Sequence, residues 1–421
     1  MPAAPARTLP RWRTDAFLAG AIALNYAARG ILPVVLPALK ADFHVSDARL
    51  GLLGSLFFWV YAICAPFGGF LGDLYSRRTL VLISVSSWSA ITLLTGFAPG
   101  WTVLLILRIV FGVSESFYLS SATGLQADHH GPETRTLALG LNSLAQNIGP
   151  VGGAALAGWL AVRWGWRGAF AGLGLLGIVL ALGSPRLLSD APLKTTKRQP
   201  RAKVGETLAY LMRDPTYLSL VLNEALSGFS VWIFFFWLPD YLYETYHVKM
   251  AAAGVAGMAM QQLTAIAGTA TGTWLSYRYP GMTPRFRHLL FALSCVISAP
   301  CLLCFLIHPS YLMVTVAIGV FSVLRGFGGV YELPVLCDVV PSAYRSTAVG
   351  LLIGGAMICG GFGIFAAGIL KAGLGLGGVF AAMSAICGLA GFGLLASYWK
   401  FIERDLARAE AWATGRAGGM P

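Results

Sequence analysis

The sequence predicts an all-α membrane protein with about 12 transmembrane helices, arranged as two pseudo-symmetric six-helix bundles. The first observation is the composition. Of 421 residues, 57% are hydrophobic and only 11% are charged, whereas a soluble domain carries about 25% charged residues. The second is a succession of apolar stretches of membrane-spanning length. The third is a motif in the first half of the chain that recurs in the second half.

The predicted helices are apolar stretches separated by polar residues or by proline and glycine. A helix needs about 20 apolar residues to cross a hydrocarbon core about 30 Å thick, and each stretch is close to that length. The predicted spans are 15–39, 49–72, 78–98, 101–125, 136–161, 167–187, 216–240, 250–275, 288–307, 310–335, 346–370 and 377–400.

A polar, basic stretch separates the sixth span from the seventh. Its basic residues include Lys194, Lys197, Arg198, Arg201 and Lys203. A stretch of this kind does not enter the hydrocarbon core, so we read it as a cytoplasmic linker that lies near the membrane surface. We therefore predict an N-terminal six-helix half at 1–187, a linker at 188–214, and a C-terminal half with a cytoplasmic tail at 215–421.

The basic residues set the predicted orientation. The formal net charge is +12, and most Lys and Arg residues fall on one side of the membrane if the N-terminus is cytoplasmic. This is the positive-inside bias, which explains the charge without a nucleic-acid partner. We expect a multi-pass protein of the plasma membrane, or the bacterial inner membrane, with both termini cytoplasmic. We expect it to be a monomer surrounded by lipid.

The sequence shows no sign of a metal, a cofactor or a nucleotide. The seven cysteines lie in or beside apolar stretches, which is typical of free thiols in helices, and the Cys301–Cys304 pair has no His or acidic partner nearby. No phosphate-binding loop is present, so ATP is not expected to be the energy source. An ion gradient is the remaining source for a transporter.

An internal repeat supports the two-half prediction. The stretch from Asp128 to Leu141 recurs half a chain later, from Asp338 to Leu351, with Arg135 and Arg345 at matched positions. Just upstream, Arg108 precedes Glu115 by the same spacing as Arg325 precedes Glu332. The repeat makes spans four and ten, and five and eleven, counterparts in two related halves.

The loop after the second span carries a recognisable motif. It reads Gly69-Phe-Leu-Gly-Asp73-Leu-Tyr-Ser-Arg77-Arg78, which resembles the major facilitator signature Gly-x-x-x-Asp-(Arg/Lys)-x-Gly-(Arg/Lys)-(Arg/Lys). Leu74 replaces a basic residue and Ser76 replaces a glycine. The resemblance implies the major facilitator fold and a secondary transporter, with charged residues gating the cytoplasmic side; for the arginines, plain positive-inside anchoring is the alternative. The expected gating residues are Gly69, Asp73, Arg77, Arg78, Asp128, Arg135, Asp338 and Arg345.

Charged residues inside the predicted spans are the candidates for function. Such a residue costs about 2.5–3.5 kcal/mol to insert at the bilayer centre, so it needs a partner or a wet cavity. The alternative is a balanced network of ion pairs that only holds helices together. The residues concerned are Arg29, Arg108, Glu115, Glu224, Arg325 and Glu332.

Arg29 is the strongest candidate for binding a substrate. It shares a helical face with Tyr26 in the stretch Asn25-Tyr-Ala-Ala-Arg29, and a guanidinium grips a carboxylate or phosphate by two parallel hydrogen bonds. The stretch resembles the first span of the anion:cation symporter and spinster-like branches of the superfamily. Those relatives commonly carry Asp before this Arg, where this chain has Ala28, so the role of that Asp in proton coupling does not carry over.

Glu115 is the candidate for proton coupling. It lies two helical turns after Arg108, so both side chains share one face, and the stretch resembles the span-four Arg-x-x-x-Gly-x-x-Glu pattern of the same branches. A carboxyl that alternates between water and Arg108 can take up and release a proton.

The second half offers further candidates. Asn223, Glu224, Tyr331 and Glu332 are expected to border the central substrate cavity, although a salt bridge from Glu224 to Arg325 is an equal alternative. The adjacent His129 and His130 are expected to be a solvated pair in a loop rather than a metal site.

Together these features predict proton-coupled symport of a small organic anion by alternating access, with a carboxylate and protons as the transported species. One alternative is a proton-coupled exporter or exchanger of drugs, lysolipids or metabolites. Another is a membrane sensor that binds its ligand without moving it. An enzyme is not expected, because no nucleophile and base combination is recognisable in the sequence.

Overall fold

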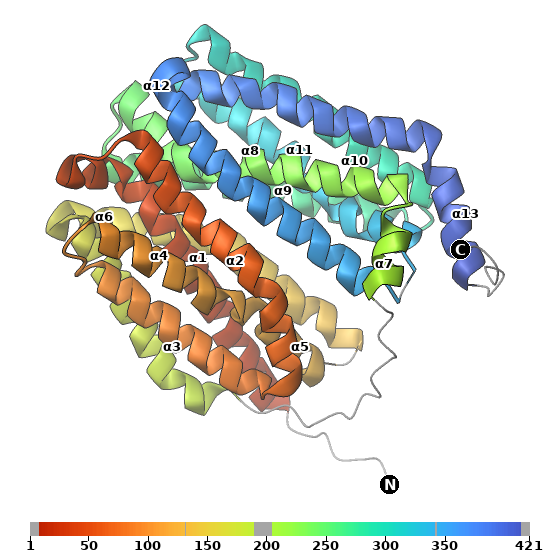
Figure 1. Cartoon of the computed structure of the whole chain (residues 1–421), viewed down its shortest axis with the longest axis horizontal. Coiled ribbons are helices and arrows are strands. Elements are labelled where there is room, and N and C mark those ends of the chain that lie inside the picture. The colour runs from red at the N-terminus through yellow and green to blue at the C-terminus, as the bar shows by residue number, and fades with distance from the viewer. Residues whose placement is uncertain (1–7, 131, 189–203, 342, 414–421) are drawn as a thin grey trace. The chain divides into compact units, whose positions relative to one another are not determined.

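The computed structural model describes the backbone of residues 8–130, 132–188, 204–341 and 343–413 (Figure 1). Throughout these ranges the regular structure is helical, as the sequence predicts. The helices of the N-terminal part are α1 (Thr8–Phe43), α2 (Asp47–Leu74), α3 (Arg77–Thr95), α4 (Trp101–Ser116), α5 (Tyr118–His129) and α6 (Pro132–Leu187). Those of the C-terminal part are α7 (Val204–Leu211), α8 (Pro215–Tyr246), α9 (Met250–Arg278), α10 (Pro284–Ser298), the 3₁₀ helix η1 (Ala299–Ile307), α11 (Tyr311–Val339), α12 (Arg345–Lys400) and α13 (Ile402–Ala413).

Ten helical stretches of the described chain are long and apolar enough to cross a membrane. Two of them, in α6 and α12, contain 51 and 54 residues and therefore hold two predicted spans each. Their turning points are Gly165, with φ 69°, and Gly375, with φ 64°. Positive φ is a conformation that glycine adopts without steric cost. Both turns fall in the gaps that the sequence predicts between spans five and six and between spans eleven and twelve.

The fourth span is one stretch from Trp101 to Gln126, as predicted, with a one-residue interruption of its helix. Helix α4 ends at Ser116 and α5 begins at Tyr118, with Phe117 between them. No proline or glycine marks this position, so the sequence shows no break. The ninth span also changes character, passing from α10 into the 3₁₀ helix η1 at Ala299.

Local caps explain where several helices begin. Ser76, the residue that replaces the signature glycine, accepts a hydrogen bond from the backbone N–H of Thr79 and caps α3. Thr283 caps α10 and Ser310 caps α11 in the same way. A hydroxyl at the N-cap satisfies a backbone donor that the helix itself leaves unpaired.

Small residues let the helices of the N-terminal part approach one another closely. A Cβ placed on Gly149 would lie 2.3 Å from the carbonyl oxygen of Ala23, and one on Gly153 would lie 2.4 Å from the Cα of Ala27. The backbones of α1 and the first segment of α6 are therefore in direct contact. Such packing is typical of helices in lipid, where no hydrophobic effect drives them together.

The C-terminal part has its own apolar core. Phe234 packs against Phe305, Phe321 and Phe380, with ring centroids 4.7 to 6.2 Å apart. A second cluster includes Tyr217, Phe291, Tyr331, Val335 and Leu394, all fully or almost fully buried.

Contacts divide the chain into two compact units. One consists of residues 1–196, 235–262 and 364–369, and the other of residues 197–234, 263–363 and 370–421. Part of the predicted linker, 189–203, lies outside the described residues, and its described end forms α7. The division into 1–187, 188–214 and 215–421 stays a prediction.

Candidate functional site

The centre of the site is a buried ion pair between the first and fourth spans. Arg29 Nε donates to Glu115 Oε2 at 2.7 Å, and Arg29 Nη2 lies 2.5 Å from the same oxygen. Arg29 is 6% exposed and Glu115 is 1% exposed. The interior strengthens such a pair, because no water competes for either partner.

Aromatic rings surround the Arg29 guanidinium. Its Cζ lies 4.5 Å from the ring centroid of Tyr26, 4.8 Å from that of Phe57 and 5.4 Å from that of Tyr61. Tyr26 belongs to α1 and the other two rings to α2. Ring faces carry negative potential, so they stabilise a cation without neutralising it. Arg29 is thus held in place by contacts that leave its positive charge available.

The break in the fourth span lies directly beside Glu115. Glu115 is the penultimate residue of α4, and Phe117 follows one residue after the end of the helix. Just past the break, the hydroxyl of Tyr118 donates to the carbonyl oxygen of Leu18 on α1 at 3.0 Å. Helix α1 is therefore bonded to the fourth span on both sides of Phe117.

Arg108, which is half-buried, supplies a second cation. Its Cζ lies 4.9 Å from the ring centroid of Phe57 and 5.4 Å from that of Phe111. In the described chain Glu115 forms its ion pair with Arg29, and Arg108 lies close enough to interact electrostatically with Glu115; the role of Arg108 in proton coupling stays a prediction. Arg108 also borders a void of about 20 Å³, which is room for about one water molecule.

Three buried polar atoms at this site make no hydrogen bond with the described residues. They are Asn25 Nδ2, Arg108 Nε and Glu115 Oε1. Leaving a buried polar atom unpaired costs about 1–3 kcal/mol, so such atoms are unusual unless they have a ligand to meet. The site also contains two guanidinium groups and one carboxyl, which leaves at least one positive charge uncompensated.

The C-terminal unit contains a second buried charge cluster. Glu224, Arg325 and Glu332 lie close enough to interact electrostatically, and Arg325 Nη1 donates to the sulfur of Cys295 at 2.9 Å. Asn223 is fully buried, with its Nδ2 unpaired. This cluster fits the alternative of a balanced ion network as well as it fits a ligand site.

Tyr331, another predicted binding residue, packs within an apolar cluster. Its side chain is 1% exposed and lies in the apolar core of the C-terminal unit, and its hydroxyl donates to the carbonyl oxygen of Gly272 at 3.2 Å. The expected contact with substrate finds no support here, because the one polar group of Tyr331 is already engaged with the backbone.

The signature arginines contact their own half of the chain. Arg77 Nη1 donates to the carbonyl oxygen of Gly124 at 2.8 Å. Arg78 donates to the carbonyl oxygens of Pro185 and Leu188, at 2.8 and 2.9 Å. The side chains of Gly69, Asp73, Asp128 and Arg135 lie outside the described residues, so the structure gives no contacts for them.

The repeated motif of the second half forms similar local contacts. Asp338 pairs with Arg287 at 3.1 Å. Arg345 donates to the carbonyl oxygens of Val340 and Cys337, at 3.0 and 2.5 Å, and so caps the C-terminal end of α11. Asp338 therefore links α11 to α10, Arg345 stabilises the α11–α12 connection, and gating stays a prediction.

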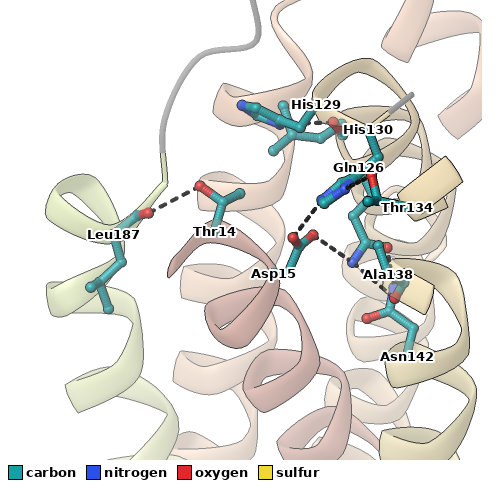
Figure 2. Close-up of polar contacts among 10 residues, drawn as sticks. Thr14, Asp15, Gln126, His129, His130, Thr134, Ala138, Asn142 and Leu187 are labelled. Carbon is teal, nitrogen blue, oxygen red and sulfur yellow. Dashed lines mark hydrogen bonds and ion pairs between the residues drawn. The ribbon is translucent and has the colours of Figure 1, made fainter. Parts of the chain in front are cut away.

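Sequence reasoning missed a buried polar network around Asp15. Figure 2 shows Asp15 of α1 between His130 and Gln126, with Asn142 beyond Gln126. His130 Nε2 lies 2.6 Å from Asp15 Oδ2, Gln126 Nε2 donates to Asp15 Oδ1 at 3.1 Å, and Asn142 Nδ2 donates to Gln126 Oε1 at 2.6 Å. We call these four residues the Asp15 network. The only sequence signal for it is an acidic residue at the start of an apolar span.

The structure corrects the expectation for the histidine pair. His130 is fully buried, whereas the sequence predicts a solvated residue, because burial of a loop depends on neighbouring helices that no local pattern reveals. No group of three metal-ligating side chains that could hold a metal ion occurs within the described residues.

Comparisons with known proteins agree with this architecture. The sequence model of the Major Facilitator Superfamily matches residues 18–331. The chain is 27% identical over 432 residues to Protein spinster homolog 1 of Xenopus laevis, which covers 93% of this chain and 81% of the relative. It is 26% identical over 299 residues to the hexuronate transporter of Bacillus subtilis, which covers 69% of this chain and 70% of the relative.

A solved structure shows the same fold. The crystal structure of a bacterial homolog of the human lysosomal transporter Spinster, in an inward-facing and unoccupied conformation, matches with a TM-score of 0.84 and 20% sequence identity. The match covers 94% of this chain and 98% of that structure. The family and its relatives are transporters rather than enzymes, and this chain, with its paired spans and buried charges, belongs to the Major Facilitator Superfamily.

Proposed function

We propose that the protein is a proton-coupled symporter of a small organic anion and works by alternating access. The observation that carries the proposal is the charge balance of the site, where, among the described residues, Arg29 and Arg108 both interact with a single carboxyl, that of Glu115. A membrane interior disfavours an uncompensated charge. An anionic substrate supplies the missing negative charge.

Arg29 is the proposed anion-binding group. Both contacts of Arg29 with Glu115 use one oxygen, Oε2, and a substrate carboxylate offers two oxygens for the same guanidinium. Asn25 contributes an unpaired amide donor and Tyr26 contributes a ring beneath the cation. Asn223, Glu224 and Glu332 are the proposed contributors from the second half.

Proton coupling follows from the competition for Arg29. When Glu115 takes up a proton, it loses its attraction for Arg29, and the guanidinium becomes free for the substrate. Protonation and anion binding then favour each other, and such coupling is reciprocal. A proton and an anion that favour each other's binding are transported together, which is symport. Arg108 keeps the site positive throughout the cycle.

The gating proposal concerns the predicted cytoplasmic side. The residues proposed to act there are Asp73 with Arg77 and Arg78, and the repeated pairs Asp128 with Arg135 and Asp338 with Arg345. The bonds from Arg77 and Arg78 to backbone carbonyls support a role in holding the ends of the helices. The similarity to a hexuronate transporter supports an organic anion as the substrate class.

A flux assay tests the function. Purified protein in liposomes with an internal pH dye is given a panel of sugar acids, and substrate-driven proton uptake is recorded. We expect uptake in the native protein and its loss in Glu115→Gln, with substrate counterflow retained because Gln cannot ionise. Asp240→Asn is the matched control, because Asp240 is a buried carboxyl of a spanning helix with no proposed role in binding or coupling. Proton uptake that continues unchanged in Glu115→Gln would refute the coupling mechanism.

The main alternative is an exporter or exchanger of drugs, lysolipids or metabolites. The similarity to a spinster homolog over 93% of the chain favours retaining it. The same liposomes distinguish the two, because labelled lysolipid that crosses the membrane while sugar acids do not would favour the alternative. Ligand binding without counterflow of any substrate would favour a sensor.

A further inference from the structure

A groove runs along the surface of the N-terminal unit, away from the proposed substrate site. It has a volume of about 460 Å³ and is formed by α1 and both segments of α6. Every side chain that lines it is apolar or glycine. Its principal lining residues are Gly20, Leu24, Gly152, Leu156, Leu176 and Val179.

The groove and Arg29 lie on opposite faces of α1. Gly20, Leu24 and Ala27 line the groove and recur at helical spacing, so they form one stripe. Arg29 follows Ala27 by two residues, which rotates its side chain by about 200° around the helix axis. A molecule in the groove would therefore support α1 from behind the ion pair.

The groove is bordered by exposed apolar side chains. Val179 is 60% exposed, Ile148 is 48% exposed and Leu176 is 46% exposed, and all three belong to a membrane-spanning stretch. A Cβ added to Gly20 or Gly152 would meet nothing within 4 Å. The groove is therefore unobstructed at these two glycines, whereas Gly149 and Gly153 pack directly against α1.

Two arginines stand at one end of the groove. Thr14 Oγ1 donates to the carbonyl oxygen of Leu187 at 3.3 Å, which brings the ends of α1 and α6 together (Figure 2). Arg13 precedes Thr14 and Arg186 precedes Leu187, and both arginines are exposed. Neither makes an ion pair within the described chain.

The register of both helices directs these arginines toward the groove. Arg13 lies two turns from Gly20 on the same face of α1, and Arg186 lies two turns from Val179 on the same face of α6. Two turns span about 11 Å along a helix. The positive-inside bias puts this end at the cytoplasmic surface, where the lipid headgroups are anionic.

We propose that the groove is a binding site for an anionic phospholipid of the cytoplasmic leaflet. One acyl chain fills the groove over Gly20 and Gly152, and the phosphate lies between Arg13 and Arg186. The apolar lining selects a hydrocarbon chain, and the unpaired guanidinium groups select an anionic headgroup. The site does not depend on which substrate the transporter carries.

Native mass spectrometry tests the proposal with the full chain. The protein is delipidated in detergent and titrated with phosphatidylglycerol or, for comparison, with phosphatidylcholine of the same chain length. We expect one tightly held phosphatidylglycerol per chain. Gly20→Leu with Gly152→Leu should weaken its binding about tenfold or more, because the leucine side chains occupy the space of several methylene groups.

A second pair of variants tests the headgroup contact separately. Arg13→Gln with Arg186→Gln should remove the preference for phosphatidylglycerol over phosphatidylcholine while the apolar groove stays intact. Gly329→Leu is the matched control for the glycine variants, because a Cβ at Gly329 of α11 also meets nothing within 4 Å. Arg163→Gln is the matched control for an exposed arginine elsewhere in the unit. Thermal unfolding checks that each variant is folded.

Three outcomes would overturn the proposal. Unchanged phosphatidylglycerol binding after the groove is filled would place the lipid elsewhere. Equal affinity for the two phospholipids in the native protein would remove the role of Arg13 and Arg186. Displacement of the phospholipid by a free fatty acid at equal concentration would show that the groove binds a chain and no phosphate. If the double glycine variant unfolds, the arginine variants and the comparison of the two phospholipids still test the proposal.

Discussion

Arg29 is held by contacts that a lysine would not reproduce. Its guanidinium bonds to Glu115 through two nitrogens and lies over three aromatic rings. An ammonium group is a compact, strongly hydrated charge without a planar fork. This difference makes a conservative exchange informative about how the proposed substrate is held.

Arg29→Lys should weaken anion binding about 10- to 100-fold, because a bidentate, charge-assisted contact is replaced by a single point of attraction. The stability of the protein should change much less, since the positive charge next to Glu115 is kept. Binding of a sugar acid is measured by calorimetry and stability by thermal unfolding. Equal affinity in the lysine variant would show that Arg29 contributes only its charge.

The Asp15 network depends on the contact between Asp15 and His130. Asp15 is 1% exposed and His130 is fully buried. Removing one partner of a buried hydrogen bond leaves the other unsatisfied, which typically costs about 1–3 kcal/mol. Asp15→Asn should therefore lower the thermal unfolding temperature clearly. Asp15→Asn combined with His130→Gln should recover part of the loss, and purely additive effects would contradict the pairing.

Sequence reasoning picked out the charged residues of the candidate site but could not predict the contact between Arg29 and Glu115. Arg29, Arg108 and Glu115 stand out because charge is costly inside a span. Helical periodicity places Arg108 and Glu115 on one face, yet it says nothing about how α1 and α4 are rotated toward each other. That rotation brings the Glu115 carboxyl next to the Arg29 guanidinium. His130 escaped notice because its burial depends on Asp15, more than a hundred positions away.

At the scale of elements, the turn within α6 rests on a single glycine. Gly165 has φ 69° and ψ 179°, and a Cβ there would meet no atom within 4 Å. Gly165→Ala should cost about 1–3 kcal/mol through backbone strain alone. Gly100→Ala is the matched control, since Gly100 is extended at φ −165° and equally open. Equal unfolding temperatures for the two variants would contradict this account.

The connection before α8 contains a carboxyl that titrates near neutral pH. Burial raises the pKa of Asp214 to about 7, and nearby Asp405 of α13 adds to the effect. In an unfolded chain an aspartate titrates near pH 4, so the folded state holds its proton more tightly. The stability that protonated Asp214 contributes is complete below about pH 4 and is lost as the pH rises to about 7.

Thermal unfolding between pH 4 and pH 8 should therefore show this loss in the native protein and a flatter profile in Asp214→Asn. The asparagine keeps the oxygen that accepts from the backbone N–H of Tyr217. Parallel profiles for the two proteins would mean that Asp214 does not titrate in this range.

The ends and turns of helices could be predicted where nearby residues in the sequence mark them. The turns at Gly165 and Gly375 fall in predicted gaps because glycine and polarity mark them. The interruption at Phe117 carries no such mark, and the backbone there keeps helical angles, with φ −89° and ψ −18°. Helix α13 lies in the predicted tail, where Asp405 accepts from the backbone N–H of Thr216 at 3.0 Å, a contact that sequence spacing does not indicate.

At the scale of the whole molecule, hydropathy alone predicts the fold well. A chain in lipid must satisfy its backbone hydrogen bonds internally, which restricts it to helices whose length the bilayer sets. The repeat from Asp128 and from Asp338 adds the two-half organisation. Function is predictable only by class, because a substrate is chosen by side-chain geometry across several helices and not by any single stretch.

The bond from Arg77 to the carbonyl oxygen of Gly124 restricts what evolution can place at position 124. A Cβ there would lie 2.8 Å from the guanidinium carbon of Arg77, so any larger side chain displaces the arginine from the carbonyl. The signature motif in the loop after the second span is therefore linked to Gly124 of the fourth span, a residue outside the motif itself. Homologous sequences that keep an arginine at position 77 should co-vary with a glycine at position 124, and both should change together where the signature is lost.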